Sequence, residues 1–206
     1  STPAFTQSFS TVSISISFGL GFGFVEGFAM PHRIPKEIHD PLSKAVGEFI
    51  THWAMVERCI DFCIAIIYQK AGGKHLDNEI PQALWRRVKF LRRCFNQVSV
   101  LASFADEGRS LLDRITALTD TRNMLVHGCL SSYTSDSNGQ EFLFVRIDLA
   151  PDKQMHVSTS LRITGREFVE NNSEAFSLTT DLIDFTDRLL QAVVPKHEIH
   201  ELFRSL

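Results

Sequence analysis

Residues 111–128 read LLDRITALTDTRNMLVHG and combine a helical apolar repeat with Arg122 and His127. Spacings of four and three residues join Leu111, Ile115, Leu118, Arg122 and Leu125. Such spacing is typical of the buried face of an amphipathic helix. A guanidinium cannot lose its charge, so burial is tolerated only beside a carboxylate, a phosphate or a wet cleft. We therefore predict a helix over about 106–127 in which Arg122 meets an anion.

This helix ends in His127 and Gly128. Histidine is the residue type whose unperturbed pKa lies near neutrality, and a glycine can end a helix in a left-handed conformation. On an ideal helix Arg122 and His127 point about 140° apart, whereas Asn123 and His127 share a face. We therefore expect Arg122 and His127 to converge only if the helix ends near Gly128 or a second subunit contributes.

Two helices are predicted before this one. Asp40 is a candidate N-cap with Pro41 in the first turn, and the apolar repeat that follows continues to about Gln69. The apolar positions of this first helix are Leu42, Val46, Phe49, Trp53, Val56, Ile60, Cys63 and Ile67. A second helix begins near Pro81, with an apolar face and a strongly basic outer surface.

The periodicity then changes to that of strands. Residues alternate over Leu143–Leu149 and Met155–Ile163, and more weakly over Leu130–Thr134, which predicts a small antiparallel meander. The Thr164–Glu167 stretch matches a capping box and opens a last helix. Its apolar positions are Phe168, Phe176, Leu182, Phe185 and Leu189. The predicted fold class is mainly α, with about four long helices and a β-meander, residues 130–163, inserted before the last helix.

Composition limits the function classes. The 206 residues suffice for a hydrophobic core without metal or disulfide staples. The net charge of −3 argues against a protein that coats nucleic acid through bulk positive charge. The four cysteines have no zinc-ligand spacing and fall in apolar or helical stretches. We interpret Cys59, Cys63, Cys94 and Cys129 as reduced core residues of a cytoplasmic protein, with no cofactor and no metal.

The first 29 residues differ from the rest of the chain. They hold six phenylalanines, four glycines and a single charged residue, Glu26. Serines and glycines interrupt the apolar run and no basic segment precedes it, so neither a membrane span nor a secretory signal is predicted. An interfacial helix would carry a Lys and Arg face, which is absent here. We interpret residues 1–29 as a leader, a tag or a disordered tail, and residues 30–206 as the helical domain.

Two features of this domain form a family pattern. They are a long first helix with Trp53 and Glu57, and a later helix that ends in Arg122, Asn123, His127 and Gly128. In both, the chain resembles the HEPN superfamily, which is marked by an Arg, a polar residue directly after it, and a His four to six residues beyond the Arg. The resemblance implies a HEPN-like helical bundle, from which the β-meander is a departure.

The resemblance also implies an activity. Many members are metal-independent endoribonucleases, often the toxins of toxin–antitoxin or defence systems, whose Arg and His line a cleft shared by a homodimer. It therefore implies RNA as substrate, an antitoxin as partner, and Arg122, His127 and Asn123 as catalytic residues. An arginine can hold the scissile phosphate, while a histidine can move a proton to or from a 2′-hydroxyl.

Two alternatives stay open at this point. In a non-catalytic interaction or sensor domain, Arg122 would pair with an acidic residue such as Glu57, and His127 would only cap the helix. A polar residue such as Arg122 in the apolar face of this helix could also serve to fix the register of a dimer. Arg86, Arg87 and Arg93 on the second helix are candidate RNA-binding residues, although a charged outer face is also what any surface helix needs.

Overall fold

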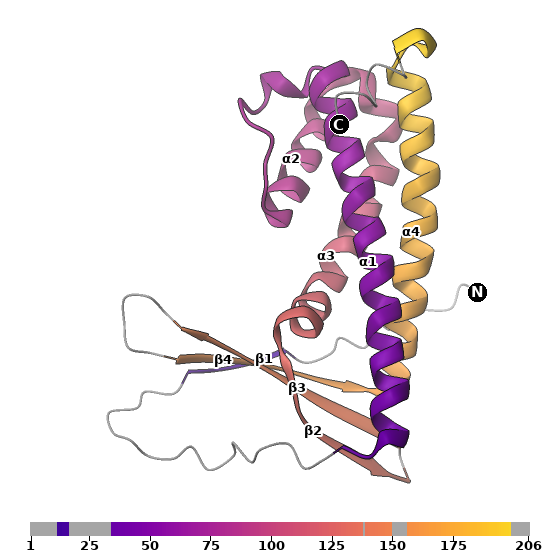
Figure 1. The fold of residues 1–206 in the computed structure, drawn as a ribbon. Coiled ribbons are helices and arrows are strands. Elements are labelled where there is room, and N and C mark those ends of the chain that lie inside the picture. The colour runs from indigo at the N-terminus through magenta and orange to yellow at the C-terminus, as the bar shows by residue number, and fades with distance from the viewer. Residues whose placement is uncertain (1–11, 17–33, 138, 150–155, 199–206) are drawn as a thin grey trace, which may run out of the picture. The chain divides into compact units, whose positions relative to one another are not determined.

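The computed structural model describes residues 12–16, 34–137, 139–149 and 156–198 (Figure 1). Over these ranges the chain forms four α-helices and four strands. In chain order they are β1 (Val12–Ile16), α1 (Lys36–Lys70), α2 (Leu84–Gln97), α3 (Ala105–His127), β2 (Cys129–Asp136), β3 (Gly139–Leu149), β4 (His156–Thr164) and α4 (Gly165–Val193). Short 3-10 helices lie at Gly73–His75, Ser99–Phe104 and Lys196–Glu198. The predicted fold class is confirmed.

The chain divides into two compact units. The sheet unit comprises residues 1–50 and 119–172, and the helical unit comprises residues 51–118 and 173–206. The C-terminal end of α3 and all four strands belong to the sheet unit, whereas α2 belongs to the helical unit.

The sheet unit contains an antiparallel sheet with the strand order β1-β4-β3-β2 (Figure 1). Phe142 pairs with Ile163 and Phe144 with Leu161, and directly paired residues of antiparallel strands share a face. All four side chains are buried. The alternation over Leu143–Leu149 predicted the strand, but it did not identify the buried face. The register with β4 places Phe142 and Phe144 on the buried face, whereas Ile147 is 45% exposed.

One strand of the sheet lies within the segment interpreted as a leader, tag or tail. Val12–Ile16 forms β1 and pairs antiparallel with β4, from Val12 opposite Leu161 to Ile16 opposite Val157. The sequence of β1 alternates β-branched residues with serine, which is the period of a strand. The other residues of 1–29 lie outside the described ranges.

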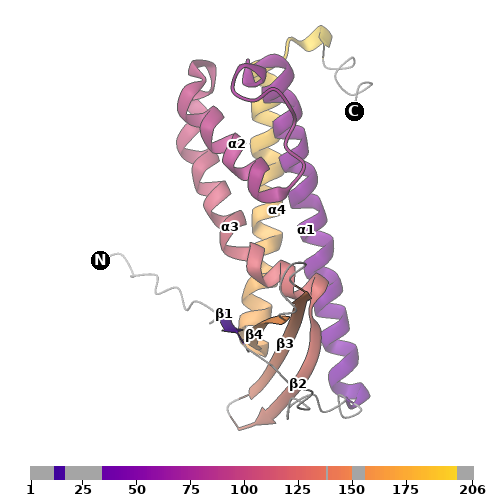
Figure 2. The same cartoon turned by 90° about the vertical axis from the view of Figure 1, so that its left-hand side faces the viewer.

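The helical unit is built around aromatic and branched side chains. Phe185 of α4 is 2% exposed, and its ring meets those of Phe95 and Phe104 edge-on, at centroid distances of 5.9 and 5.8 Å. Trp53 of α1 is also 2% exposed. Helices α2 and α3 lie side by side, and Arg92 donates to Asp113 between them at 2.6 Å (Figure 2). The burial of these large side chains is the main stabilising term of this unit.

The first helix begins five residues earlier than predicted. Asp40 was predicted as the N-cap, but α1 begins at Lys36 and Pro41 lies inside it. The N–H groups of Ile38 and His39 donate to the carbonyl of Pro35, at 3.0 and 2.9 Å, and so form the first turn. Pro41 is exposed, so water can satisfy the carbonyl that its missing N–H leaves unbonded.

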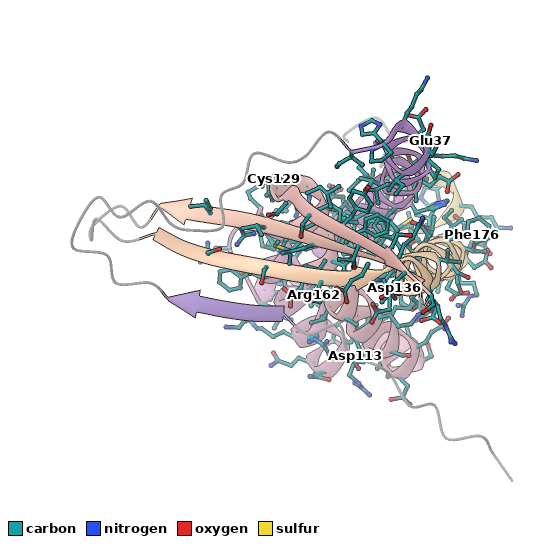
Figure 3. All side chains as sticks on the ribbon, turned by 90° about the horizontal axis from the view of Figure 1, so that it is seen from below. Glu37, Asp113, Cys129, Asp136, Arg162 and Phe176 are labelled. Atoms are coloured by element: carbon teal, nitrogen blue, oxygen red, sulfur yellow. The ribbon has the colours of Figure 1, made fainter. Side chains whose placement is uncertain are left out.

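The start of α4 is confirmed in detail. The backbone N–H of Thr164 donates to Glu167 Oε2 at 2.8 Å, and the N–H of Glu167 donates to Thr164 Oγ1 at 3.1 Å. These reciprocal bonds form the capping box that the sequence predicted. One apolar position of α4 was assigned wrongly, because Phe176 is 59% exposed (Figure 3). Its ring packs edge-on against His52 at a centroid distance of 5.3 Å instead of entering the core.

Candidate active site

The candidate site lies where α3 ends and β2 begins, within the sheet unit (Figure 1). His127 is the last helical residue, as predicted, and the N–H of Gly128 donates to the carbonyl of Met124 at 2.9 Å. A Cβ atom at Gly128 would lie 2.6 Å from the Met124 carbonyl oxygen and 3.4 Å from that of Val145. Only glycine therefore allows the chain to pass from the helix into the sheet at this point.

Glycine is required here for a reason other than the one expected. Gly128 was expected to be able to end the helix in a left-handed conformation, but the described glycines with positive φ are Gly72 and Gly139. The prediction of a left-handed Gly128 is therefore wrong. The constraint is the Met124 carbonyl oxygen, which lies too close to the position of an added Cβ atom, whereas the Val145 carbonyl oxygen lies at an ordinary contact distance.

Arg122 is half-buried in the last turns of α3, between the buried residues Thr121 and Leu125. Its Nη1 donates to Asn123 Oδ1 at 3.1 Å. This bond brings together two of the three predicted catalytic residues. It directs the Asn123 carbonyl toward the guanidinium and leaves the amide NH₂ of Asn123 to serve as a donor.

His127 is exposed, and within the described part of the chain its imidazole makes no hydrogen bond or ion pair. Because α3 remains helical up to this residue, Arg122 and His127 keep the separation of about 140° that five helical steps impose. The end of the helix therefore does not by itself turn the two side chains toward one another. A shared site needs a second copy of the chain or a ligand that spans both groups.

The remaining predicted site residues belong to the helical unit. Glu57, predicted as structural support, accepts a hydrogen bond from Trp53 Nε1 at 2.8 Å, one turn away on α1. This bond satisfies the indole N–H of a buried tryptophan. The carboxylate therefore has a structural role within α1.

The three candidate RNA-binding arginines of α2 differ from one another. Arg87 lies 2.8 Å from Asp61, and Arg93 donates to the carbonyl of Leu76 at 2.5 Å. These two side chains hold α2 against its neighbours. Arg86 is exposed, and its guanidinium lies 5.1 Å from the centre of the Trp85 ring.

The cysteines were predicted as core residues, and three of them are. Burial raises the pKa of Cys63 and of Cys94 to about 12, and it also raises the pKa of Cys59. These thiols are therefore poor nucleophiles at neutral pH. The prediction is wrong for Cys129, which is exposed on β2 (Figure 3). Its Sγ lies 3.4 Å from the Val145 carbonyl, at the edge of the sheet.

A polar network between α3 and α4 was not recognised in the sequence. Arg114 donates from Nε to Glu174 and from Nη1 to Asp181, both at 2.6 Å. Seven residues away on each of the same two helices, Arg188 of α4 donates to Glu107 of α3. Burial alone would lower the pKa of Arg114, but its hydrogen bonds to the two carboxylates outweigh burial and raise that pKa. The detectable signal was charge spacing, since residues 174, 181 and 188 recur every seven positions.

Two features are absent from the described residues. No three His, Cys, Asp or Glu side chains in these ranges are grouped so that they could hold a metal ion. None of the helices in the same ranges has the length and hydropathy needed to cross a membrane. Comparison with protein-family models, curated proteins and solved structures finds no match to this chain.

Proposed function

We propose that the protein is a metal-independent endoribonuclease of the HEPN type, with Arg122, Asn123 and His127 as its catalytic residues. The observation that carries the proposal is the end of α3, where a half-buried arginine is followed by an exposed histidine that Gly128 holds at the helix terminus. An arginine and an imidazole together supply charge stabilisation and proton transfer, so the reaction needs no metal-bound hydroxide. The HEPN resemblance supports a cytoplasmic toxin with an antitoxin partner.

The proposed reaction is an intramolecular displacement at phosphorus. The 2′-oxygen of the RNA forms a bond to the phosphorus while the bond from phosphorus to the 5′-oxygen breaks. His127 accepts the 2′-hydroxyl proton, and the departing 5′-oxygen takes a proton from a water molecule and leaves as a hydroxyl. Arg122 neutralises the charge on the phosphorane, and the Asn123 amide donates to a phosphate oxygen. The products are a 2′,3′-cyclic phosphate and a 5′-hydroxyl, and DNA is not cleaved because it lacks the 2′-hydroxyl.

The proposed site is composite and forms in a homodimer. Arg122 of one copy acts with His127 of the other, because the two groups diverge on a single helix. Mixing Arg122→Ala and His127→Ala proteins tests this directly. With random exchange, half of the dimers contain one intact site of two, so about one quarter of the wild-type activity returns. Two inactive proteins that stay inactive after verified subunit exchange would show that the site is not shared.

The primary test is end-group analysis of a cleaved RNA oligonucleotide with and without excess EDTA. We expect cleavage in both conditions, with 2′,3′-cyclic phosphate or 3′-phosphate ends. His127→Ala should reduce the rate by about 10²–10⁴-fold. The matched control is His39→Ala, because His39 is an exposed helical histidine outside the motif. Metal-dependent cleavage with 5′-phosphate ends would contradict the mechanism, and no cleavage of any RNA would favour the non-catalytic interaction domain.

A further inference from the structure

Helix α2 is the most basic element of the described chain. Its 14 residues, LWRRVKFLRRCFNQ, include five cations and no acidic residue, in a protein whose net charge is −3. Basic helices usually have one of two roles. Their cations either pair with carboxylates of neighbouring elements, or they remain in solvent where an anionic ligand can reach them.

Three of the five cations have acidic partners within the helical unit. The pairs are Arg87 with Asp61 at 2.8 Å, Arg92 with Asp113 at 2.6 Å, and Arg93 with Asp77 at 3.8 Å. These partners lie on α1, on α3 and in the segment before α2. Three positive charges of α2 are therefore balanced inside the fold and serve its packing.

The other two cations, Arg86 and Lys89, are exposed and have no salt bridge within the described ranges. Trp85 lies beside them and is 63% exposed, which is unusual for the largest apolar side chain. The guanidinium of Arg86 lies 5.1 Å from the centre of the indole ring. Residues three and four positions apart are neighbours on a helix surface, so Trp85, Arg86 and Lys89 form one surface, here called the Trp85 patch.

We infer that the Trp85 patch binds single-stranded RNA, an inference that rests on the proposed ribonuclease function for its ligand class. Single-stranded RNA offers flat bases and phosphates at short, regular intervals. An exposed indole can stack on a base, while Arg86 and Lys89 contact the flanking phosphates. Every base has a flat face, so this contact increases affinity without selecting sequence.

The composition of the patch distinguishes RNA from an anionic membrane. Membrane-binding basic clusters usually hold about four to eight Lys and Arg residues, whereas this patch offers two cations beside one aromatic ring. One aromatic and two cations match the needs of a short run of nucleotides. The patch also lies in the helical unit, whereas the α3 motif lies in the sheet unit, so binding and cleavage can be altered by separate substitutions.

The test uses the wild-type protein and a fluorescein-labelled 2′-O-methyl uridine 12-mer, which cannot be cleaved through a 2′-hydroxyl. Fluorescence anisotropy should show binding that Trp85→Ala weakens by about tenfold. The double variant Arg86→Gln with Lys89→Gln should weaken it to a similar extent. It should also reduce the slope of log affinity against log salt by about 1.4, because two phosphate contacts are lost.

The matched control is the double variant Lys44→Gln with Arg166→Gln, which removes the same charge from exposed residues of the sheet unit. Its affinity should stay within about twofold of wild type, since the charge is removed away from the patch. Unchanged binding by Trp85→Ala, or equal losses in the control, would overturn the inference. So would a wild-type protein that fails to bind the 12-mer but binds anionic vesicles through Trp85. If Trp85-dependent binding is found without any RNA cleavage, the patch stands and the proposed catalytic function fails.

Discussion

The two units differ in the way they use their charged side chains. In the helical unit, arginines join one helix to another, as in the Arg92–Asp113 and Arg188–Glu107 pairs. In the sheet unit, the described helical ion pairs are mostly local, like the one-turn pair Arg166–Glu170 at 2.9 Å. Here the conspicuous polar groups lie at the end of α3, where His127 faces solvent. A charged side chain with a carboxylate partner therefore supports the fold, whereas a polar group without one among the described residues, such as His127, is available to a ligand.

The largest expected change in stability comes from a substitution in the core of the helical unit. Phe185→Ala should reduce the free energy of unfolding by about 3–5 kcal/mol, because it empties a site where three aromatic rings meet. Phe176→Ala, on the same helix but 59% exposed, should cost less than about 1 kcal/mol. Urea denaturation followed by circular dichroism measures both values. Equal losses would mean that the two rings are buried alike and that the assignment of the core is wrong.

The next effect tests the junction of α3 with the sheet. Gly128→Ala should reduce the free energy of unfolding by about 1–3 kcal/mol, because its Cβ would lie 2.6 Å from a backbone oxygen that cannot move alone. RNA cleavage should also fall, since the shift moves the neighbouring His127. The control is Gly47→Ala in α1, where nothing lies within 4 Å of the added Cβ. That change should stabilise the protein by about 0.5–1 kcal/mol. A stable, fully active Gly128→Ala protein would contradict this role for the glycine.

A smaller effect concerns the ion pairs themselves. Arg114→Gln should cost about 1–2 kcal/mol, because the side chain is only 28% exposed and leaves two carboxylates without their donor. Arg162→Gln in the sheet unit should cost about 0.5 kcal/mol or less, because this side chain is 62% exposed and pairs with Glu141 alone. Urea denaturation at low and high salt measures the loss of unfolding free energy in each variant. Equal losses in the two variants would contradict the contrast between the units.

The sequence predicted the elements whose signals are local. The four-residue spacing of α3, its end at His127, and the Thr164–Glu167 capping box depend on neighbours within one turn, and all are observed. The predicted start of α1 was wrong because two positions can begin this helix. Asp40 is an acceptable N-cap, but the carbonyl of Pro35 accepts the first helical hydrogen bonds. A short-range signal cannot choose between two adequate caps.

What could not be predicted depends on contacts between distant residues. The buried face of β3 follows from its register with β4, which a single strand does not specify when both of its faces hold apolar residues. The error at Phe176 has a different cause, because the helical spacing of the buried residues Ala175, Leu178 and Leu182 already leaves Phe176 on another face of α4. At the candidate site, the end of α3 at His127 was predicted, but the approach of the Val145 carbonyl, 3.4 Å from a Cβ atom added at Gly128, comes from β3 and has no local signal.

The smallest expected effect is a dependence on pH at the end of the helical unit. Lys70 donates to Glu198 at 2.5 Å, and this hydrogen bond lowers the pKa of the Glu198 carboxyl below its ordinary value of 4.5. A carboxyl with a lower pKa in the folded state stabilises the fold above its unfolded pKa. That stabilisation is lost as the pH falls through the folded pKa. Both groups are near the surface, so added salt should weaken the effect.

Lys70→Gln should raise the pKa of Glu198 toward 4.5, as measured by a carbon-13 NMR titration of its carboxyl group. The same variant should lose slightly more stability at pH 6 than at pH 3, since the wild-type interaction is already weakened by protonation at the lower pH. Lys44→Gln is the matched control, because its pair with Glu48 is longer, at 3.8 Å, and more exposed. An unchanged Glu198 titration in Lys70→Gln would show that this charged pair, unlike Arg114 and its carboxylates, does not persist in solution.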